Sequence, residues 1–151
     1  MIPASAKPIV IDTNVLLDLF VFNDPRWGEL LQAIESGEVQ ALTRADCRDE
    51  YLAVLRYPHL PLDDDSRAQA AARFDALLRL VAPDAKHVRL PVCTDRDDQK
   101  FMELARDAGA TVLISKDKAL LKLNRKTAQA GLFRIMLPEA WLKARAAGTL
   151  E

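Results

Sequence analysis

Ile9-Val10-Ile11-Asp12-Thr13-Asn14 is the most informative stretch of this sequence. Its first three residues are β-branched and apolar without alternation, which is typical of a short strand buried on both faces. Apolar residues resume at positions 15, 16, 19 and 20, which is the spacing of one face of a helix. We therefore expect Asp12 at the carboxyl end of a buried strand, where a helix begins. In open α/β sheets this edge binds ligands, although a carboxylate there can also simply cap the helix.

Strand and helix patterns alternate along the rest of the chain. The helices that we expect cover residues 15–20, 24–36, 45–57, 62–81, 97–108 and 118–121, and a last helix begins at Pro138. The further strands that we expect cover residues 38–43, 88–90, 111–115 and 132–137. This alternation predicts an α/β fold, a three-layer sandwich with a mainly parallel four- or five-stranded sheet flanked by helices. No repeat or linker divides the 151 residues, so we expect a single domain.

The composition is that of a globular protein without a strong overall charge. The formal net charge is -1, so binding to nucleic acid would depend on a local basic patch or on bound cations. Cys47 and Cys93 have no metal-binding spacing and give no disulfide framework, so we expect two reduced thiols. The first eight residues hold no apolar signal core, and no apolar run approaches the ~20 residues that span a bilayer. We therefore expect a cytoplasmic protein without a membrane partner.

Three later segments place acids where the edge that holds Asp12 can collect them. Glu50 borders the buried stripe of its helix, and Asp117 follows a buried strand just as Asp12 does. If these two strands are neighbours, the carboxylates of Asp12 and Asp117 meet at the crevice where the strand order switches. Structural interpretations remain open for both later acids. Glu50 can pair with Arg48 or Arg56, and Asp117 can cap the helix that follows it.

The third acid comes from the run Thr94-Asp95-Arg96-Asp97-Asp98. Asp98 shares the face of Phe101 on the helix that follows, so we expect it to turn toward the packed side. Asp97 lies near that face, whereas Asp95 is expected to point away from it. A capped, acidic first turn would explain the same run without any chemistry, because acids are favourable at the positive end of a helix.

Four carboxylates that converge without matched bases repel one another, and this raises some of their pKa values. Divalent cations remove the conflict, because carboxylates suit Mg²⁺ or Mn²⁺ and the chain has no His or Cys set that suits zinc. Two such ions ~4 Å apart orient water and stabilise the leaving oxygen in phosphodiester hydrolysis. The acids therefore point to metal-dependent cleavage of a phosphodiester.

Other classes of protein also place acids at strand ends. An aspartyl phosphatase requires a second Asp two residues after the first, where this chain has Asn14. A phospho-acceptor receiver requires a Lys at the end of the last strand, and Leu137-Pro138 offers none. A module that binds RNA or protein without cutting stays open, with the acids serving as helix caps.

Four pieces of the sequence, in this order, resemble a known family. They are Ile9-Val10-Ile11-Asp12-Thr13-Asn14, Arg48-Asp49-Glu50 followed by Leu55-Arg56-Tyr57-Pro58, Asp98-Gln99-Lys100-Phe101-Met102-Glu103-Leu104-Ala105, and Leu113-Ile114-Ser115-Lys116-Asp117-Lys118. Together they resemble PIN-domain nucleases, of the kind found as the toxin of VapC-type toxin–antitoxin pairs. The resemblance runs from about Val10 to Leu137.

This resemblance implies a metal-dependent endoribonuclease that uses Mg²⁺ or Mn²⁺. The implied catalytic residues and metal ligands are Asp12, Glu50, Asp98 and Asp117, with Asn14 and Ser115 supporting them. It also implies an RNA substrate, a homodimer, and a cognate antitoxin that holds the toxin inactive.

Two lysines flank Asp117. We expect Lys116 and Lys118 to bind the RNA backbone, although a solvated charged surface would look the same in sequence. Lys116 is also a departure from the family, which often has a small residue at that position. His59 stands alone in no shared motif, so we do not expect it to be a metal ligand or a general base.

Overall fold

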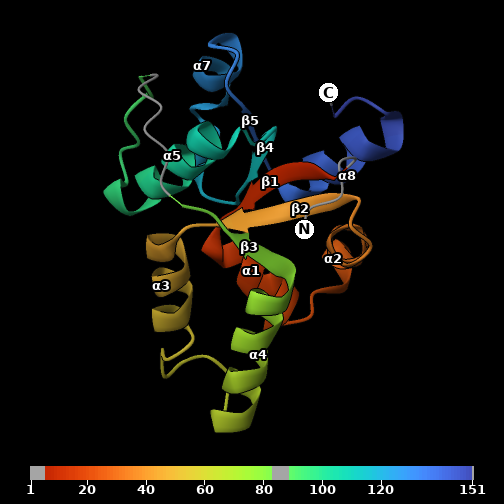
Figure 1. The fold of residues 1–151 in the computed structure, drawn as a ribbon, viewed down its shortest axis with the longest axis vertical. Coiled ribbons are helices and arrows are strands. Elements are labelled where there is room, and N and C mark those ends of the chain that lie inside the picture. Colours follow the sequence, from red (N-terminus) through yellow and green to blue (C-terminus); the bar gives the residue numbers. More distant parts are fainter. Residues whose placement is uncertain (1–5, 83–88, 151) are drawn as a thin grey trace.

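The computed structural model describes residues 6–82 and 89–150, in which helices flank a central sheet (Figure 1). The strands are β1 (Lys7–Ile11), β2 (Val39–Thr43), β3 (Leu78–Leu80), β4 (Val112–Ile114) and β5 (Arg134–Met136). The α-helices are α1 (Thr13–Phe20), α2 (Gly28–Glu35), α3 (Ala45–Val54), α4 (Asp64–Leu77), α5 (Gln99–Ala108), α6 (Lys118–Leu121), α7 (Asn124–Gln129) and α8 (Pro138–Ala147). The 3₁₀ turns η1 (Pro25–Trp27) and η2 (Arg96–Asp98) lead into α2 and α5.

All strands of the sheet run parallel, in the order β3-β2-β1-β4-β5. β1 lies at the centre, where Ile9 is in register with Ala41 of β2 and Val112 of β4. The chain places β2 and β3 on one side of β1 and then returns to place β4 and β5 on the other. The strand order therefore switches between β1 and β4, and ligand crevices open at such a point, beyond the carboxyl ends of the strands. The expected fold class is confirmed.

The central strands are buried on both faces, as their unbroken apolar sequences predicted. Successive side chains of a strand point to opposite faces, so Ile9 and Ile11 enter one core while Val10 enters the other. Helices α1, α2, α4 and α8 contribute to the first core, and α5 and α6 to the second. Two helical layers thus enclose the sheet and leave the ends of its strands open.

Helices α3 and α4 form an arm that extends from the sheet (Figure 1). Tyr51 of α3 stacks on Phe74 of α4 with ring centroids 4.4 Å apart, and its hydroxyl donates to the carbonyl oxygen of Ala70 at 2.9 Å. These contacts lie inside the apolar core, where all three residues are buried. The packing of Tyr51 fixes the rotation of α3 and so determines where the adjacent Glu50 points.

The strand β3 is a correction to the sequence prediction. We expected a helix over residues 62–81, but α4 ends at Leu77 and residues 78–80 form a strand. Leu78 is in register with Ala41 of β2, so a long-range pairing overrides the local apolar pattern that would continue the helix. The strand expected over 88–90 is wrong for Arg89 and Leu90, which lie in irregular structure, and Val88 lies outside the described residues.

The other expected elements are present, some of them with ends shifted by a few residues. The helix expected over 45–57 ends at Val54, and Leu55 and Arg56 continue as a turn. Helix α7 was not expected, because its sequence is polar and has no apolar periodicity. Among the described residues of this helix, only Thr127 is buried. None of these differences moves the strand ends at the centre of the sheet.

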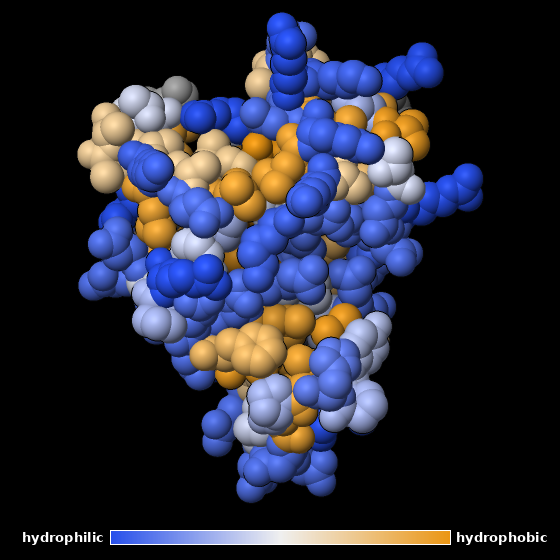
Figure 2. Space-filling view, turned by 180° about the vertical axis from the view of Figure 1, so that it is seen from behind, coloured by the Kyte–Doolittle hydropathy of each residue, from blue (hydrophilic) through white to orange (hydrophobic). Residues whose placement is uncertain are grey.

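The back face of the molecule carries hydrophobic side chains in separate areas among hydrophilic ones (Figure 2). Large hydrophobic side chains that are exposed include Phe22, Tyr57, Leu80 and Val92. No helix within residues 6–82 and 89–150 is both long and apolar enough to cross a membrane.

Candidate metal centre

Asp12 follows β1 directly and lies at the switch point. Its backbone N–H donates to the carbonyl oxygen of Ile114 at 2.9 Å, which joins the ends of β1 and β4. Its side chain is almost fully buried, and Oδ2 accepts a hydrogen bond from Ser115 Oγ at 2.7 Å. Burial raises the pKa of Asp12, the hydrogen bond from Ser115 opposes this rise, and the charges of Glu50 and Asp117 add to it.

Asp117 reaches the same place from the end of β4. Its backbone N–H donates to Ser115 Oγ at 2.9 Å, so one buried hydroxyl links the two aspartates. The Asp117 side chain also accepts from the backbone N–H of Ala119 at 2.8 Å, which caps α6. The capping interpretation is therefore correct for this residue, and it leaves the second carboxylate oxygen available to the crevice.

Asp98 is the acid with the strongest electrostatic perturbation. It is buried, and within the described structure its Oδ2 atom is a buried side-chain oxygen without a hydrogen-bond partner. Burial first, and then the neighbouring Asp117 and the charge of Asp12, raise the pKa of Asp98 to about 8. A buried oxygen that lacks a donor is a place where a cation would bind favourably.

Asp95 joins this group, contrary to our expectation. Ligand atoms of Asp95, Asp98 and Asp117 all lie within 4.8 Å of one another. We expected Asp95 to point away because we extended the periodicity of α5 backwards, but η2 interrupts that periodicity just before the helix. Asp95 also accepts from the backbone N–H of Asp97 at 3.0 Å, so it caps η2 as well.

Glu50 faces the other acids from the arm. Thr13 Oγ1 donates to Glu50 Oε2, and Lys100 Nζ lies 2.9 Å from Glu50 Oε1. Lys100 Nζ also donates to the carbonyl oxygen of Asp97, so this ammonium bridges α3 and η2. The structural alternative from sequence was a pair between Glu50 and Arg48 or Arg56, but Arg48 instead forms an ion pair with Asp75 of α4 at 2.9 Å.

Lys100 is a residue that sequence reasoning missed. It lies in the first turn of α5, where the helix dipole disfavours a cation. That position was a signal that Lys100 has an acidic partner, but only the tertiary structure shows that the partner is Glu50.

These acids line one pocket with a volume of about 320 Å³. Among the described residues, the carboxylates that line it are Asp12, Glu50, Asp95, Asp97, Asp98 and Asp117. Asn14 and Thr13 also line it, as do the side chains of Tyr57 and His59. His59 therefore lies at the wall of this pocket, and the expectation that it is neither a metal ligand nor a general base stays a prediction.

Lys116 and Lys118 are placed differently from the acids. Lys116 Nζ forms an ion pair with Asp18 Oδ2 at 2.6 Å, and Asp18 also accepts from Trp27 Nε1 at 3.2 Å. Lys118 is exposed at the start of α6. Neither lysine is among the described residues that line the acidic pocket.

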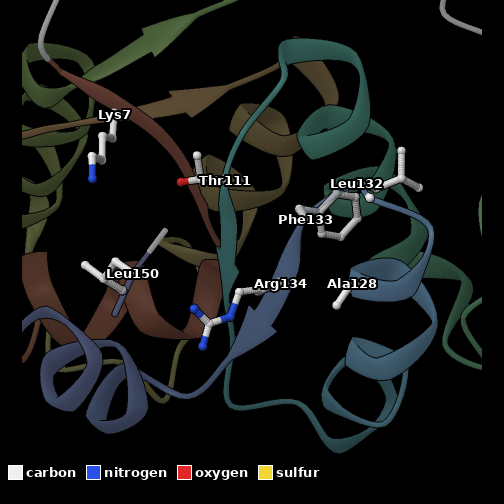
Figure 3. Close-up of a pocket in the computed structure, with 8 residues that line it drawn as sticks. Lys7, Thr111, Ala128, Leu132, Phe133, Arg134 and Leu150 are labelled. Atoms are coloured by element: carbon white, nitrogen blue, oxygen red, sulfur yellow. The ribbon is translucent and has the colours of Figure 1, made fainter. Parts of the chain in front are cut away.

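A larger cavity, of about 520 Å³, lies at the opposite edge of the sheet (Figure 3). Lys7, Thr111 and Arg134 come from the starts of β1, β4 and β5, and Leu132, Phe133 and Leu150 add apolar walls. None of the described residues that line it has a carboxyl group. The larger cavity is therefore not the better candidate for the functional site. The carboxylates of the smaller, acidic pocket favour that pocket instead.

The acidic pocket fits a hard divalent cation. Its ligands are carboxylate oxygens from separate elements, one of them buried without a partner, and oxygen ligands are what Mg²⁺ and Mn²⁺ prefer. The ammonium of Lys100 neutralises only part of the negative charge. The fold and site together define an α/β protein with a candidate metal centre at its switch point.

Comparison with known proteins identifies the family. A family model described as PIN domain matches residues 8–119, which is most of the chain. The chain belongs to the PIN-domain family, whose members are generally nucleases that use divalent metal ions. No curated protein matches the chain.

Proposed function

We propose that this protein is a metal-dependent endoribonuclease that hydrolyses phosphodiester bonds of RNA. The observation that carries the proposal is the buried, unpartnered Oδ2 of Asp98 among carboxylates from three other segments. Such an arrangement is unfavourable without a cation and becomes favourable with one. Membership of the PIN-domain family supports the same chemistry.

In this proposal Asp12, Glu50, Asp98 and Asp117 would hold the metal at the end of the central strands. Asp95, whose ligand atom lies within 4.8 Å of those of Asp98 and Asp117, completes the acidic wall. A bound Mg²⁺ or Mn²⁺ supplies Lewis-acid activation of water and stabilises developing negative charge on the phosphate.

The protein's own residues have separate tasks. Ser115 holds Asp12 and the backbone of Asp117 in fixed positions, and it is fully buried, so the carboxylates cannot rotate freely. Thr13 and Lys100 orient Glu50. Asp98, with its pKa of about 8, retains a proton near neutral pH and releases it when a cation binds to its carboxylate.

We further propose, from the family resemblance, that the protein is the cytoplasmic toxin of a toxin–antitoxin pair, forms a homodimer and is inhibited by a cognate antitoxin. Lys118 is the exposed lysine that we assign to the RNA backbone, because Lys116 is paired with Asp18. A small neighbouring gene with a DNA-binding amino half, whose product binds the protein and blocks cleavage, would support this role.

The test is RNA cleavage by the purified protein with Mn²⁺, with Mg²⁺ and with EDTA. We expect cleavage with either metal, none with EDTA, and products that carry a 5′-phosphate. Metal-dependent binding of RNA without cleavage would instead support the alternative, a non-cleaving RNA- or protein-binding module.

A further inference from the structure

Two aromatic rings stand on the wall of the acidic pocket and have no task in the chemistry above. Tyr57 and His59 both line the pocket, and their ring centroids lie 5.7 Å apart with planes tilted by 44°. Tyr57 is 48% exposed, unlike Tyr51 and Phe74 of the same arm, which stack on each other inside the core. The exposed part of Tyr57 is therefore accessible to a molecule that enters the pocket.

The turn that carries the two rings is well fixed. The backbone N–H of Tyr57 donates to the carbonyl oxygen of Val54 at 3.0 Å, and that of Leu60 donates to the carbonyl oxygen of Tyr57 at 3.1 Å. Leu60 is buried and anchors the far end of the turn. Pro58 lies between the rings and restricts the backbone further. The turn directly follows α3, the helix that carries Glu50, so the rings and the acid belong to the same arm.

We propose that Tyr57 and His59 form a stacking platform for a nucleobase next to the scissile phosphodiester. The inference rests on the proposed nuclease function and assigns two positioning residues to it, which would hold an unpaired base of the RNA beside the acids. Aromatic side chains bind unpaired bases by stacking and tolerate any sequence, because every base has a π face.

The surroundings of the rings favour a nucleotide over a protein partner. The volume of about 320 Å³ lies in the range of small-ligand pockets rather than of a protein interface. Leu17, Val54 and Leu60 line the pocket with the two rings and supply apolar contacts for a base. The carboxylates of the same pocket are where a phosphate is received once a cation is bound, and phosphate and base of one nucleotide lie close together.

The experiment compares Tyr57→Ala, His59→Ala and the double variant with Tyr57→Phe, which keeps the ring. The substrate is a single-stranded oligoribonucleotide with Mn²⁺. We expect the double variant to raise KM about 5- to 150-fold, the range that removal of one stacked ring gives, while kcat changes little because the acids are intact. Tyr57→Phe should keep the KM of the unaltered protein.

Phe22→Ala is the matched control, since Phe22 is 50% exposed, close to the exposure of Tyr57, and is not among the described residues that line the pocket. It should leave KM unchanged. Hydrolysis of bis(p-nitrophenyl) phosphate with Mn²⁺ tests the metal chemistry separately, so a protein that hydrolyses neither this ester nor RNA refutes the proposed function itself. Thermal melts verify that every variant is folded.

A second measurement does not require cleavage. A single-stranded oligoribonucleotide that contains 2-aminopurine should lose fluorescence when it binds with Ca²⁺, which replaces Mg²⁺ to avoid cleavage, because the base stacks. The double variant should lack this quenching. Normal quenching and normal KM in the double variant would overturn the stacking platform while leaving the nuclease proposal intact. A changed oligomeric state with unchanged KM would assign the rings to a protein interface and would overturn it too.

Discussion

Asp12 is nearly fully buried and also lines the pocket. Little water reaches its negative charge, so the hydrogen bond from Ser115 and a bound cation are the interactions that can stabilise it. Asp12→Asn keeps the size of the side chain and an oxygen that accepts from Ser115, but removes the charge. We expect RNA cleavage to fall by more than about 100-fold, because groups that merely support a metal ligand already cost about 10- to 100-fold when removed. The fold should persist, as a thermal melt would verify.

Asp65→Asn is the control for that substitution, because Asp65 is exposed in the first turn of α4 and is not among the described residues of the pocket. Its activity should equal that of the unaltered protein. Undiminished Mn²⁺-dependent cleavage by purified Asp12→Asn protein would show that the Asp12 carboxylate is not needed for the reaction, which contradicts its role as a metal ligand.

Asp98 gives a prediction about pH. Its pKa of about 8 in the folded protein lies above the ordinary value of 3.8, so the folded state binds the proton more tightly than the unfolded state. The stability that this carboxyl contributes is therefore fully present below pH ~4 and is lost as the pH rises through ~8. Asn cannot ionise and does not suffer this loss.

In EDTA at pH 8.5 we therefore expect Asp98→Asn to melt at a higher temperature than the unaltered protein. The difference should shrink as the pH is lowered toward 5, where Asp98 regains its proton. A constant difference between the two melting temperatures across this range would show that Asp98 ionises normally and is not perturbed by its neighbours.

At the scale of the elements, the pair Lys116–Asp18 connects the loop after β4 to α1. Asp18 is largely buried, so Lys116→Met leaves its carboxylate with the weaker hydrogen bond from Trp27. We expect a loss of about 1 kcal/mol in the free energy of unfolding, modest because Lys116 itself is partly exposed. Urea unfolding at pH 7 measures it.

RNA binding separates the two lysines beside Asp117. Lys118→Ala should lower the slope of log affinity against log salt by about 0.7, as one lost phosphate contact on a single strand requires. Lys116→Met should leave that slope unchanged, because its ammonium is held by Asp18. If Lys116→Met lowered the slope and Lys118→Ala did not, the RNA contact would belong to Lys116 and not to Lys118.

The elements that sequence predicted best are those whose environment is uniform. Residues 9–11 of β1 and all of β4 are buried on both faces, so each forms an unbroken apolar run that no amphipathic helix would show. β3 is an edge strand, and Leu78 and Leu80 continue the apolar pattern of α4. Its conformation depends on pairing with β2, 37 residues away at Ala41 and Leu78, which no local pattern contains.

For the whole molecule, the acids at strand ends were predictable, because parallel strands bring their carboxyl ends to one edge. The positions of Asp12, Asp117 and Ser115 follow from that rule and from β1 and β4 being neighbours. Asp95, Lys100, Tyr57 and His59 were not predicted as site residues. Their places depend on η2 and on how the arm packs against the sheet, and both are set by contacts between distant residues.

Only the folded chain brings the segments β1, α3, η2 and β4 together at the acids. A cation that binds this arrangement and not the unfolded chain stabilises the protein by about 2.7 kcal/mol at 100 times its dissociation constant. For a chain of this length that corresponds to a rise in Tm of about 5–10 °C.

Titration of Mn²⁺ in a thermal melt at pH 7.5 should show this rise in Tm for the unaltered protein and for Asp65→Asn. Asp98→Asn should show a smaller rise, since it lacks one ligand. A Tm that does not change up to saturating Mn²⁺ would mean that the acids repel one another without binding a metal, and the pocket would then lack the cofactor on which the proposed reaction depends.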